Sequence, residues 1–119
     1  MDAASFARSL DEAFPGKLTW ADRSPKRLYV NVDPADLLEI VAWMRARHAG
    51  CRLGTSTGID LREGVAVFHH FAINGEALLV PLKALAPKPQ PSLPSLAAPI
   101  PAASWIERAM HEFLGIDFE

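Results

Sequence analysis

Apolar residues recur at a helical period near the N-terminus, and this pattern predicts a first helix. Its apolar positions are Phe6, Leu10, Ala13 and Phe14. Pro15 and Gly16 are expected to end the helix, because proline has no amide hydrogen for the helix ladder and glycine tolerates the turn. Alternating residues then predict two short strands, over 17–20 and 28–32, with the polar run 21–26 as the turn between them.

A second amphipathic stretch predicts a helix from Pro34 to Ala49. Asp33 can cap its free amides, and Pro34 stands where a missing N–H costs nothing. Gly50 is expected to be the C-cap. The expected apolar stripe consists of Leu37, Leu38, Val41 and Met44. The cations of the last turn, which suit the helix dipole, are Arg45, Arg47 and His48.

From Cys51 onward the apolar period is two, which predicts strands near 51–60, 64–73 and 77–85. Asn74-Gly75 indicates a hairpin between the last two strands, because both residues accept a positive φ. The expected order is therefore helix, two strands, helix and three strands. Since strands and helices do not alternate regularly, this order favours an α+β fold, a two-layer domain with a mixed sheet, over a doubly wound sheet.

The C-terminal part of the chain begins with a proline-rich segment. Residues 87–104 hold six of the ten prolines, so this segment is expected to be extended and semi-rigid. Leu93, Leu96 and Ile100 are spaced to contact a surface. A short final helix is predicted over 102–114, ended by Gly115, with an apolar stripe of Ile106, Met110, Phe113 and Leu114. We thus expect an α+β core over 1–86 and a segment, 87–119, packed on the same domain.

Composition narrows the function classes. A chain of 119 residues, half of them apolar, suits one globular domain. Its net charge of −2 disfavours nucleic acid as the main partner, since phosphate binding needs a basic face. The single Cys51 can form no internal disulfide, which makes a reducing, cytoplasmic location the default. It follows a helix C-terminus, where the pKa of a thiol is expected to rise. No membrane span or secretory signal is expected.

Motifs that carry chemistry are not found. The segment 54–58 is rich in glycine but lacks the lysine and helix of a phosphate loop. His69 and His70 are adjacent on a predicted strand, so they point to opposite faces and cannot chelate one ion together. Glu107 and His111 share a helix face, but two ligands are too few for zinc. We therefore expect no catalytic residue, no metal and no cofactor. Acid–base catalysis by a pair of carboxylates stays open, but the sequence indicates no particular pair.

The stretch from Pro94 to Ile116 contains a Pro-Ser step, then Ala-Ala-x-Trp, Glu-Arg, an acidic residue and Gly-Ile. It resembles the signature of the respiratory complex I 30 kDa subunit family, whose members belong to NADH-quinone oxidoreductases. That family includes a similar N-terminal domain of formate hydrogenlyase and membrane-bound hydrogenase large subunits. The resemblance extends over about 28–119. The chain departs from the family at Ala109, where a glutamate is usual, and in ending before a Gly-His-Pro tail. The missing tail leaves open the interpretation that the domain is truncated before a further C-terminal part. The matching signature positions are Ala102, Ala103, Trp105, Glu107, Arg108, Glu112, Gly115 and Ile116.

The resemblance implies a non-catalytic scaffold subunit or domain of complex I or of a related hydrogenase complex. Such a protein has no cofactor and docks against the hydrogenase-type (49 kDa-like) large subunit. It is cytoplasmic and reaches the inner membrane only through other subunits. The last helix would bury one side and present the charges of its other side to the partner. The alternative is that Glu107 and Arg108 are solvated surface charges without a partner. The expected partner-binding residues are Trp105, Glu107, Arg108, Met110, Glu112 and Phe113.

A second hypothesis is a stand-alone small-molecule binding module that uses the concave sheet face near His69 or His70. The two hypotheses predict different surfaces. A ligand pocket should be enclosed within the domain, whereas a scaffold should expose an apolar patch along Trp105, Met110 and Phe113. A hydrolytic enzyme, the third possibility, has no motif in its favour.

Overall fold

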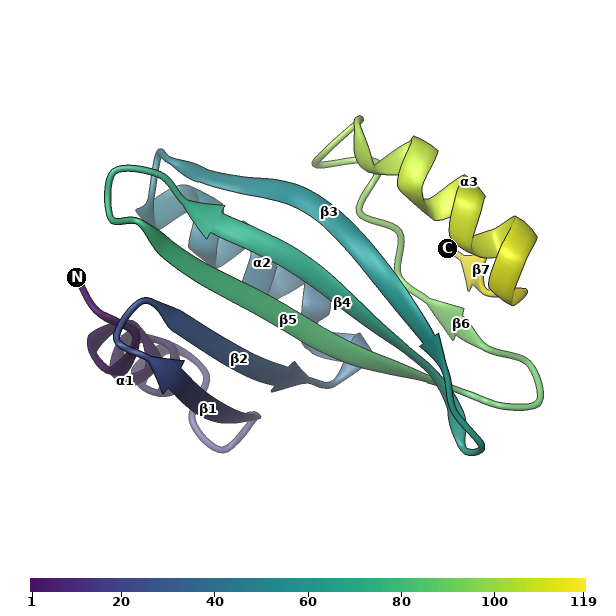
Figure 1. Ribbon diagram of the computed structural model, residues 1–119, viewed down its shortest axis with the longest axis horizontal. Helices are drawn as coiled ribbons and strands as arrows, with labels where there is room; N and C mark the ends of the chain where they lie inside the picture. Colours follow the sequence, from purple (N-terminus) through teal and green to yellow (C-terminus); the bar gives the residue numbers. More distant parts are fainter.

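Five strands form one mixed sheet in the order β1-β2-β5-β4-β3 (Figure 1). The computed structural model describes residues 1–119. The sheet is antiparallel except where β2 runs parallel to β5. The predicted α+β fold with a mixed sheet is therefore confirmed. The strands are β1 (Leu18–Ser24), β2 (Arg27–Val32), β3 (Cys51–Asp60), β4 (Gly64–Ile73) and β5 (Leu78–Pro87).

Two helices, α1 (Ala3–Ala13) and α2 (Leu37–Arg47), lie behind this sheet in Figure 1. The α1 helix begins at Asp2, whose carboxylate accepts a hydrogen bond from Ser5 N at 2.9 Å. Asp33 caps the second helical segment through Ala35 N at 2.9 Å, as predicted. A 3-10 turn over Pro34–Asp36 precedes α2. The predicted stripe is wrong at Leu38, which is 44% exposed, because the buried positions are Leu37, Ile40, Val41 and Met44.

The β1–β2 hairpin is longer than its sequence pattern predicts. The polar run 21–26 is predicted to be a turn, but β1 continues to Ser24. Pairing with β2 explains the difference, since ladder hydrogen bonds hold residues 19–24 in the edge strand although their side chains are exposed. The β4–β5 hairpin is confirmed. Its loop spans 74–77, however, and the positive φ angles fall at Gly75 and Ala77 and not at Asn74.

One continuous core joins the sheet, α1, α2 and the C-terminal part of the chain. Leu93 and Leu96 are buried in this core, and Ile100 packs against it, as the spacing in the proline-rich segment predicts. Within this segment β6 (Ser92–Leu93) pairs in parallel with β7 (Asp117–Phe118), and the segment leads into the last helix, α3 (Ala103–Leu114). The division into parts at 86–87 stays a prediction. No helix in the structure has the length and apolarity needed to cross a membrane.

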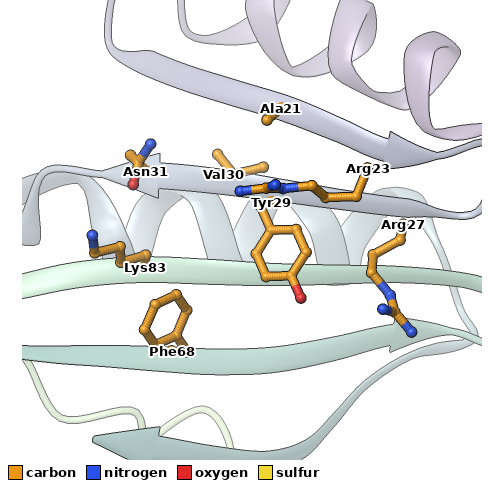
Figure 2. Close-up of a pocket in the computed structure, with 8 residues that line it drawn as sticks. All are labelled: Ala21, Arg23, Arg27, Tyr29, Val30, Asn31, Phe68 and Lys83. Carbon is orange, nitrogen blue, oxygen red and sulfur yellow. The ribbon is translucent and has the colours of Figure 1, made fainter. Parts of the chain in front are cut away.

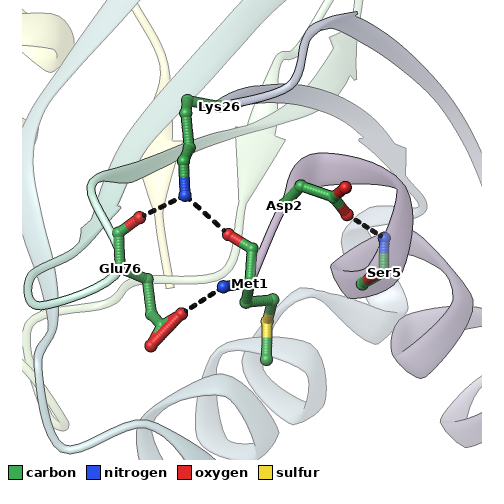
Figure 3. A network of polar contacts seen from close by, with 5 residues as sticks. All are labelled: Met1, Asp2, Ser5, Lys26 and Glu76. Atoms are coloured by element: carbon green, nitrogen blue, oxygen red, sulfur yellow. Dashed lines mark hydrogen bonds and ion pairs between the residues drawn. The ribbon is translucent and has the colours of Figure 1, made fainter.

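The first residues are tied to the hairpin ends by an exposed polar network (Figure 3). The amino group of Met1 lies 2.6 Å from the Glu76 carboxylate. Lys26 Nζ donates to the carbonyl oxygens of Met1 and Glu76, at 2.9 and 3.0 Å. The neighbouring amino group lowers the pKa of Glu76. Because the network is exposed, we expect it to orient the N-terminus and to add little to stability.

A side chain at position 58 is expected to push α3 away from β3. A Cβ on Gly58 would collide with Leu114 Cδ1 and lie 3.7 Å from Met110 Sδ. We expect Gly58→Val to lower the free energy of unfolding by about 2 kcal/mol through overpacking. Gly54→Val is the matched control, since a Cβ at position 54 would meet only His70 O, at 3.4 Å. Denaturant unfolding measures both, and equal losses would contradict the proposed contact.

A candidate partner-binding surface on the last helix

The α3 helix lies on the β3 side of the sheet (Figure 1), and it buries one face and exposes the other. Ala103, Glu107 and Met110 are buried, with Ile106 and Leu114 packed against the core. The predicted stripe is thus correct at Ile106, Met110 and Leu114 and wrong at Phe113, which is 83% exposed. The predicted patch is likewise wrong at Met110, which is covered. The helix is rotated about its axis relative to the prediction because a charged residue, Glu107, occupies the inner face.

The Glu107 side chain points into the domain and forms hydrogen bonds there. Its carboxylate accepts hydrogen bonds from Ser95 Oγ at 2.6 Å and from Leu96 N at 2.7 Å, and the residue is only 7% exposed. It therefore fastens the proline-rich segment to α3 with two charge-assisted bonds. The expectation that Glu107 presents its charge to a partner is wrong, and so is the alternative of a solvated surface charge. The Pro94-Ser95 step of the signature holds the partner of this glutamate, a signal that sequence reasoning missed.

The exposed face of α3 carries two large aromatic side chains. Trp105 is 72% exposed, and Phe113 lies two turns further along the same side of the helix. The Arg108 guanidinium carbon lies 5.1 Å from the centre of the Trp105 ring, a cation–π contact that orders both side chains. Ala109, a small side chain, lies between the two aromatics in the helix. This face therefore offers aromatic anchors instead of a continuous charged strip.

Arg108 and Glu112 complete this surface. Both are exposed, and neither takes part in an ion pair of the domain. An unpaired guanidinium beside an exposed aromatic ring can form a two-pronged bond with a partner carboxylate. We call Trp105, Arg108, Ala109, Glu112 and Phe113 the α3 surface. Of the six predicted partner-binding residues, the structure brings four to it and buries Glu107 and Met110.

The end of α3 is held in place by its C-terminal turn. Gly115 adopts a left-handed conformation, with φ of 72°, which ends the helix at the predicted residue. His111 Nδ1 lies 2.9 Å from the carbonyl oxygen of Ile116, a residue that is itself buried. The Trp105–Phe113 stripe is therefore presented by a helix fixed at its start by Glu107 and at its end by Ile116.

The remaining candidate residues for chemistry lie apart from one another. His69 is buried and lies 2.8 Å from Ser56 Oγ, whereas His70 lies on the opposite face, 3.0 Å from Thr57 Oγ1, as the alternation predicts. No group of three or more His, Cys, Asp and Glu side chains converges to hold a metal ion. Burial raises the pKa of the Cys51 thiol. The direction matches the prediction, but the cause is burial and not the end of the helix.

Protonation of His69 is expected to destabilise the fold. Burial, and then the neighbouring charge of His70, lowers the pKa of His69 from 6.5 to about 4. The unfolded chain takes up this proton below 6.5 and the folded chain only near 4. Stability is therefore lost as the pH falls through this window, by about 2 kcal/mol at pH 5. Urea unfolding near pH 7.5 and pH 5 measures the loss. A His69→Leu variant should lose less than the wild type, and an equal loss would contradict the assignment.

Two hollows that share Arg27 and Tyr29 lie on the sheet face turned away from α1 and α2, and Figure 2 shows the larger of the two. Their volumes are about 570 and 380 Å³. Arg27 and Tyr29 line both, His70 lines the second, and His69 lines neither. Both hollows lie on the surface of the sheet and not inside the domain. The sequence-based hypothesis of a ligand face near His70 agrees with the second hollow. It missed the walls from β2 and β5, because no local pattern reveals that these strands pair.

The chain matches known proteins along most of its length. A family model described as respiratory-chain NADH dehydrogenase, 30 Kd subunit, matches residues 30–119. A subunit of the F(420)H(2) dehydrogenase of Methanosarcina mazei is 28% identical over 122 residues, which span 100% of this chain and 77% of that protein.

Two solved structures share the fold. The membrane-bound sulfane sulfur reductase, an archaeal respiratory membrane complex, contains a chain that matches with a TM-score of 0.87 at 21% identity. The match covers 98% of this chain and 69% of that one. The trypsin-resistant fragment (1-134) of Nqo5 matches with a TM-score of 0.80 at 22% identity, over 96% of this chain and 95% of the fragment. At these identities the two structures establish the fold alone.

Proposed function

The chain belongs to the respiratory-chain NADH dehydrogenase 30 Kd subunit family, and from this premise we propose that it is a non-catalytic scaffold subunit or domain of a membrane-associated redox complex. The complex is an NADH:quinone oxidoreductase or a related membrane-bound hydrogenase or formate hydrogenlyase. Within it, the chain docks against the hydrogenase-type large subunit. It lies on the cytoplasmic side and reaches the membrane through other subunits.

The observation that carries this proposal is the exposure of Trp105 and Phe113 on a helix whose other face is firmly anchored. Large aromatic side chains on a fixed helix are typical anchors of a protein interface, because they bury much area at little cost in conformational entropy. Arg108 and Glu112 flank them with one charge of each sign. The α3 surface therefore suits a partner surface that combines an apolar recess with complementary charges.

Purification of the tagged protein from its own cells in mild detergent tests the proposal. We expect the large subunit to be recovered with it, and Arg108→Glu to reduce that recovery on the order of tenfold, because the substitution places two like charges in contact. Arg8→Glu, on the exposed side of α1, is the matched control and should leave recovery unchanged. Recovery of the chain without any redox subunit would overturn the scaffold role.

A small-molecule binding module is the alternative function, and the two hollows on the open sheet face, the larger of them drawn in Figure 2, are its structural basis. Ligand sites of that kind usually bury most of the ligand surface. These hollows instead lie on an open sheet face, and their walls are strands without a covering loop or helix. The exposed aromatics of α3 therefore support docking more strongly than the hollows support a small ligand.

A further inference from the structure

The open face of the sheet gathers positive charge. Arg23 on β1, Arg27 on β2 and Lys83 on β5 line the larger hollow, and no Asp or Glu lines either hollow (Figure 2). None of these cations takes part in an ion pair of the domain. The chain as a whole has a net charge of −2. This face therefore carries positive side chains with no carboxylate among its lining residues, although the net charge of the whole chain is negative.

Aromatic rings hold two of these cations in position. The Arg23 guanidinium carbon lies 5.5 Å from the centre of the Tyr29 ring, and Lys83 Nζ lies 5.8 Å from the centre of the Phe68 ring. Cation–π contacts of this kind restrict each side chain in advance, so it loses less conformational entropy when it binds an anion. Each cation also occupies one face of its ring, which leaves less ring surface for the stacking of nucleic-acid bases.

We propose that this face, formed by Arg23, Arg27, Tyr29, Phe68 and Lys83, binds an acidic segment of a partner protein. The carboxylates of the segment pair with the cations, and its apolar side chains contact the parts of the rings left open. A protein segment fits better than nucleic acid because the chain is acidic overall and one face of each ring is already occupied. The surface is distinct from α3, so the proposal does not rest on docking to the large subunit.

The register of β2 and β5 fixes the distance between Arg27 and Lys83, and so the spacing that the carboxylates of the bound segment need. In the parallel β2–β5 pair, Lys83 lies beside Asn31, four positions along β2 from Arg27. That offset corresponds to about 13 Å along an extended strand. Arg27 lines both hollows, and Lys83 lines the larger one. An extended segment with acidic residues about four positions apart therefore reaches both Arg27 and Lys83.

Nuclear magnetic resonance titration with a random copolymer of Glu and Tyr tests the proposal, since the copolymer samples many spacings. We expect saturable shifts of the backbone amides of Arg27, Tyr29, Phe68 and Lys83. An Arg27→Glu, Lys83→Glu double variant should bind on the order of tenfold more weakly. An Arg8→Glu, Arg62→Glu double variant changes the same charge away from this face and should bind like the wild type.

Parallel titrations separate the other sources of negative charge. A neutral copolymer of Gln and Tyr, single-stranded poly(dT) and phosphatidylglycerol vesicles are the comparison probes. Weaker binding of all three, with shifts confined to the open face, supports an acidic protein segment. Tighter binding of poly(dT) or of vesicles, shifts centred on α3, equal weakening in both double variants, or no saturable binding would overturn the proposal.

Discussion

Glu107→Ala is expected to lower the free energy of unfolding by about 3 kcal/mol or more. The substitution removes the carboxylate that accepts from Ser95 Oγ and Leu96 N, and it leaves the buried Leu96 amide without a partner. Because these bonds join α3 to the proline-rich segment, we expect the C-terminal part to loosen first. Denaturant unfolding measures the loss, and amide hydrogen exchange of Leu96 locates it.

Two further variants make this expectation specific. Glu107→Gln keeps one acceptor oxygen and nearly the same volume, so it should lose less stability than Glu107→Ala. Glu112→Ala removes a carboxylate from the exposed face of the same helix and should change stability by less than about 0.5 kcal/mol. If Glu107→Ala and Glu112→Ala have equal effects, the buried carboxylate does not hold the segment.

The Trp105→Ser, Phe113→Ser double variant is expected to weaken binding to the large subunit on the order of a hundredfold or more. Each substitution removes an aromatic anchor, and anchors of this kind typically contribute about 2 kcal/mol or more to binding. The fold should be almost unaffected, because both side chains are mostly exposed in the domain itself. Isothermal titration of the purified large subunit measures the affinity, and thermal unfolding checks the fold.

Leu38→Ser is the matched control for the aromatic pair. Leu38 is also an exposed apolar side chain, but it lies on α2 and away from the α3 surface. Its substitution should leave the affinity for the large subunit unchanged. An affinity equal to that of the wild type in the aromatic double variant would show that the large subunit does not bind through α3.

Local patterns predicted much of the fold because the relevant forces act over a few residues. The Asp33 cap, the end of α3 at Gly115 and the strands over 51–60 and 64–73 all follow from period, capping and turn chemistry. The continuation of β1 to Ser24 was not predictable in this way, since an exposed polar strand exists only through pairing with β2.

The candidate site was predicted only in part, for a related reason. A periodic pattern treats every charged residue as exposed and every apolar residue as buried. At α3 both assumptions fail, because Glu107 bonds to Ser95 and Leu96 from the inner face while Phe113 faces outward. The helix and its end at Gly115 could be predicted from the sequence, but its rotation depends on a tertiary contact. The basic sheet face depends likewise on the non-local pairing of β2 with β5.

Photo-crosslinking from position 109 tests the docking of α3 most directly. Ala109 lies on the exposed face between Trp105 and Phe113, so a photoreactive phenylalanine there faces the partner without removing an anchor. In the assembled complex, purified from its own cells, we predict a crosslink to the large subunit. The same group at Leu38 should give none. A crosslink from 109 only to other subunits, or no crosslink in an intact complex, would contradict the scaffold role assigned to α3.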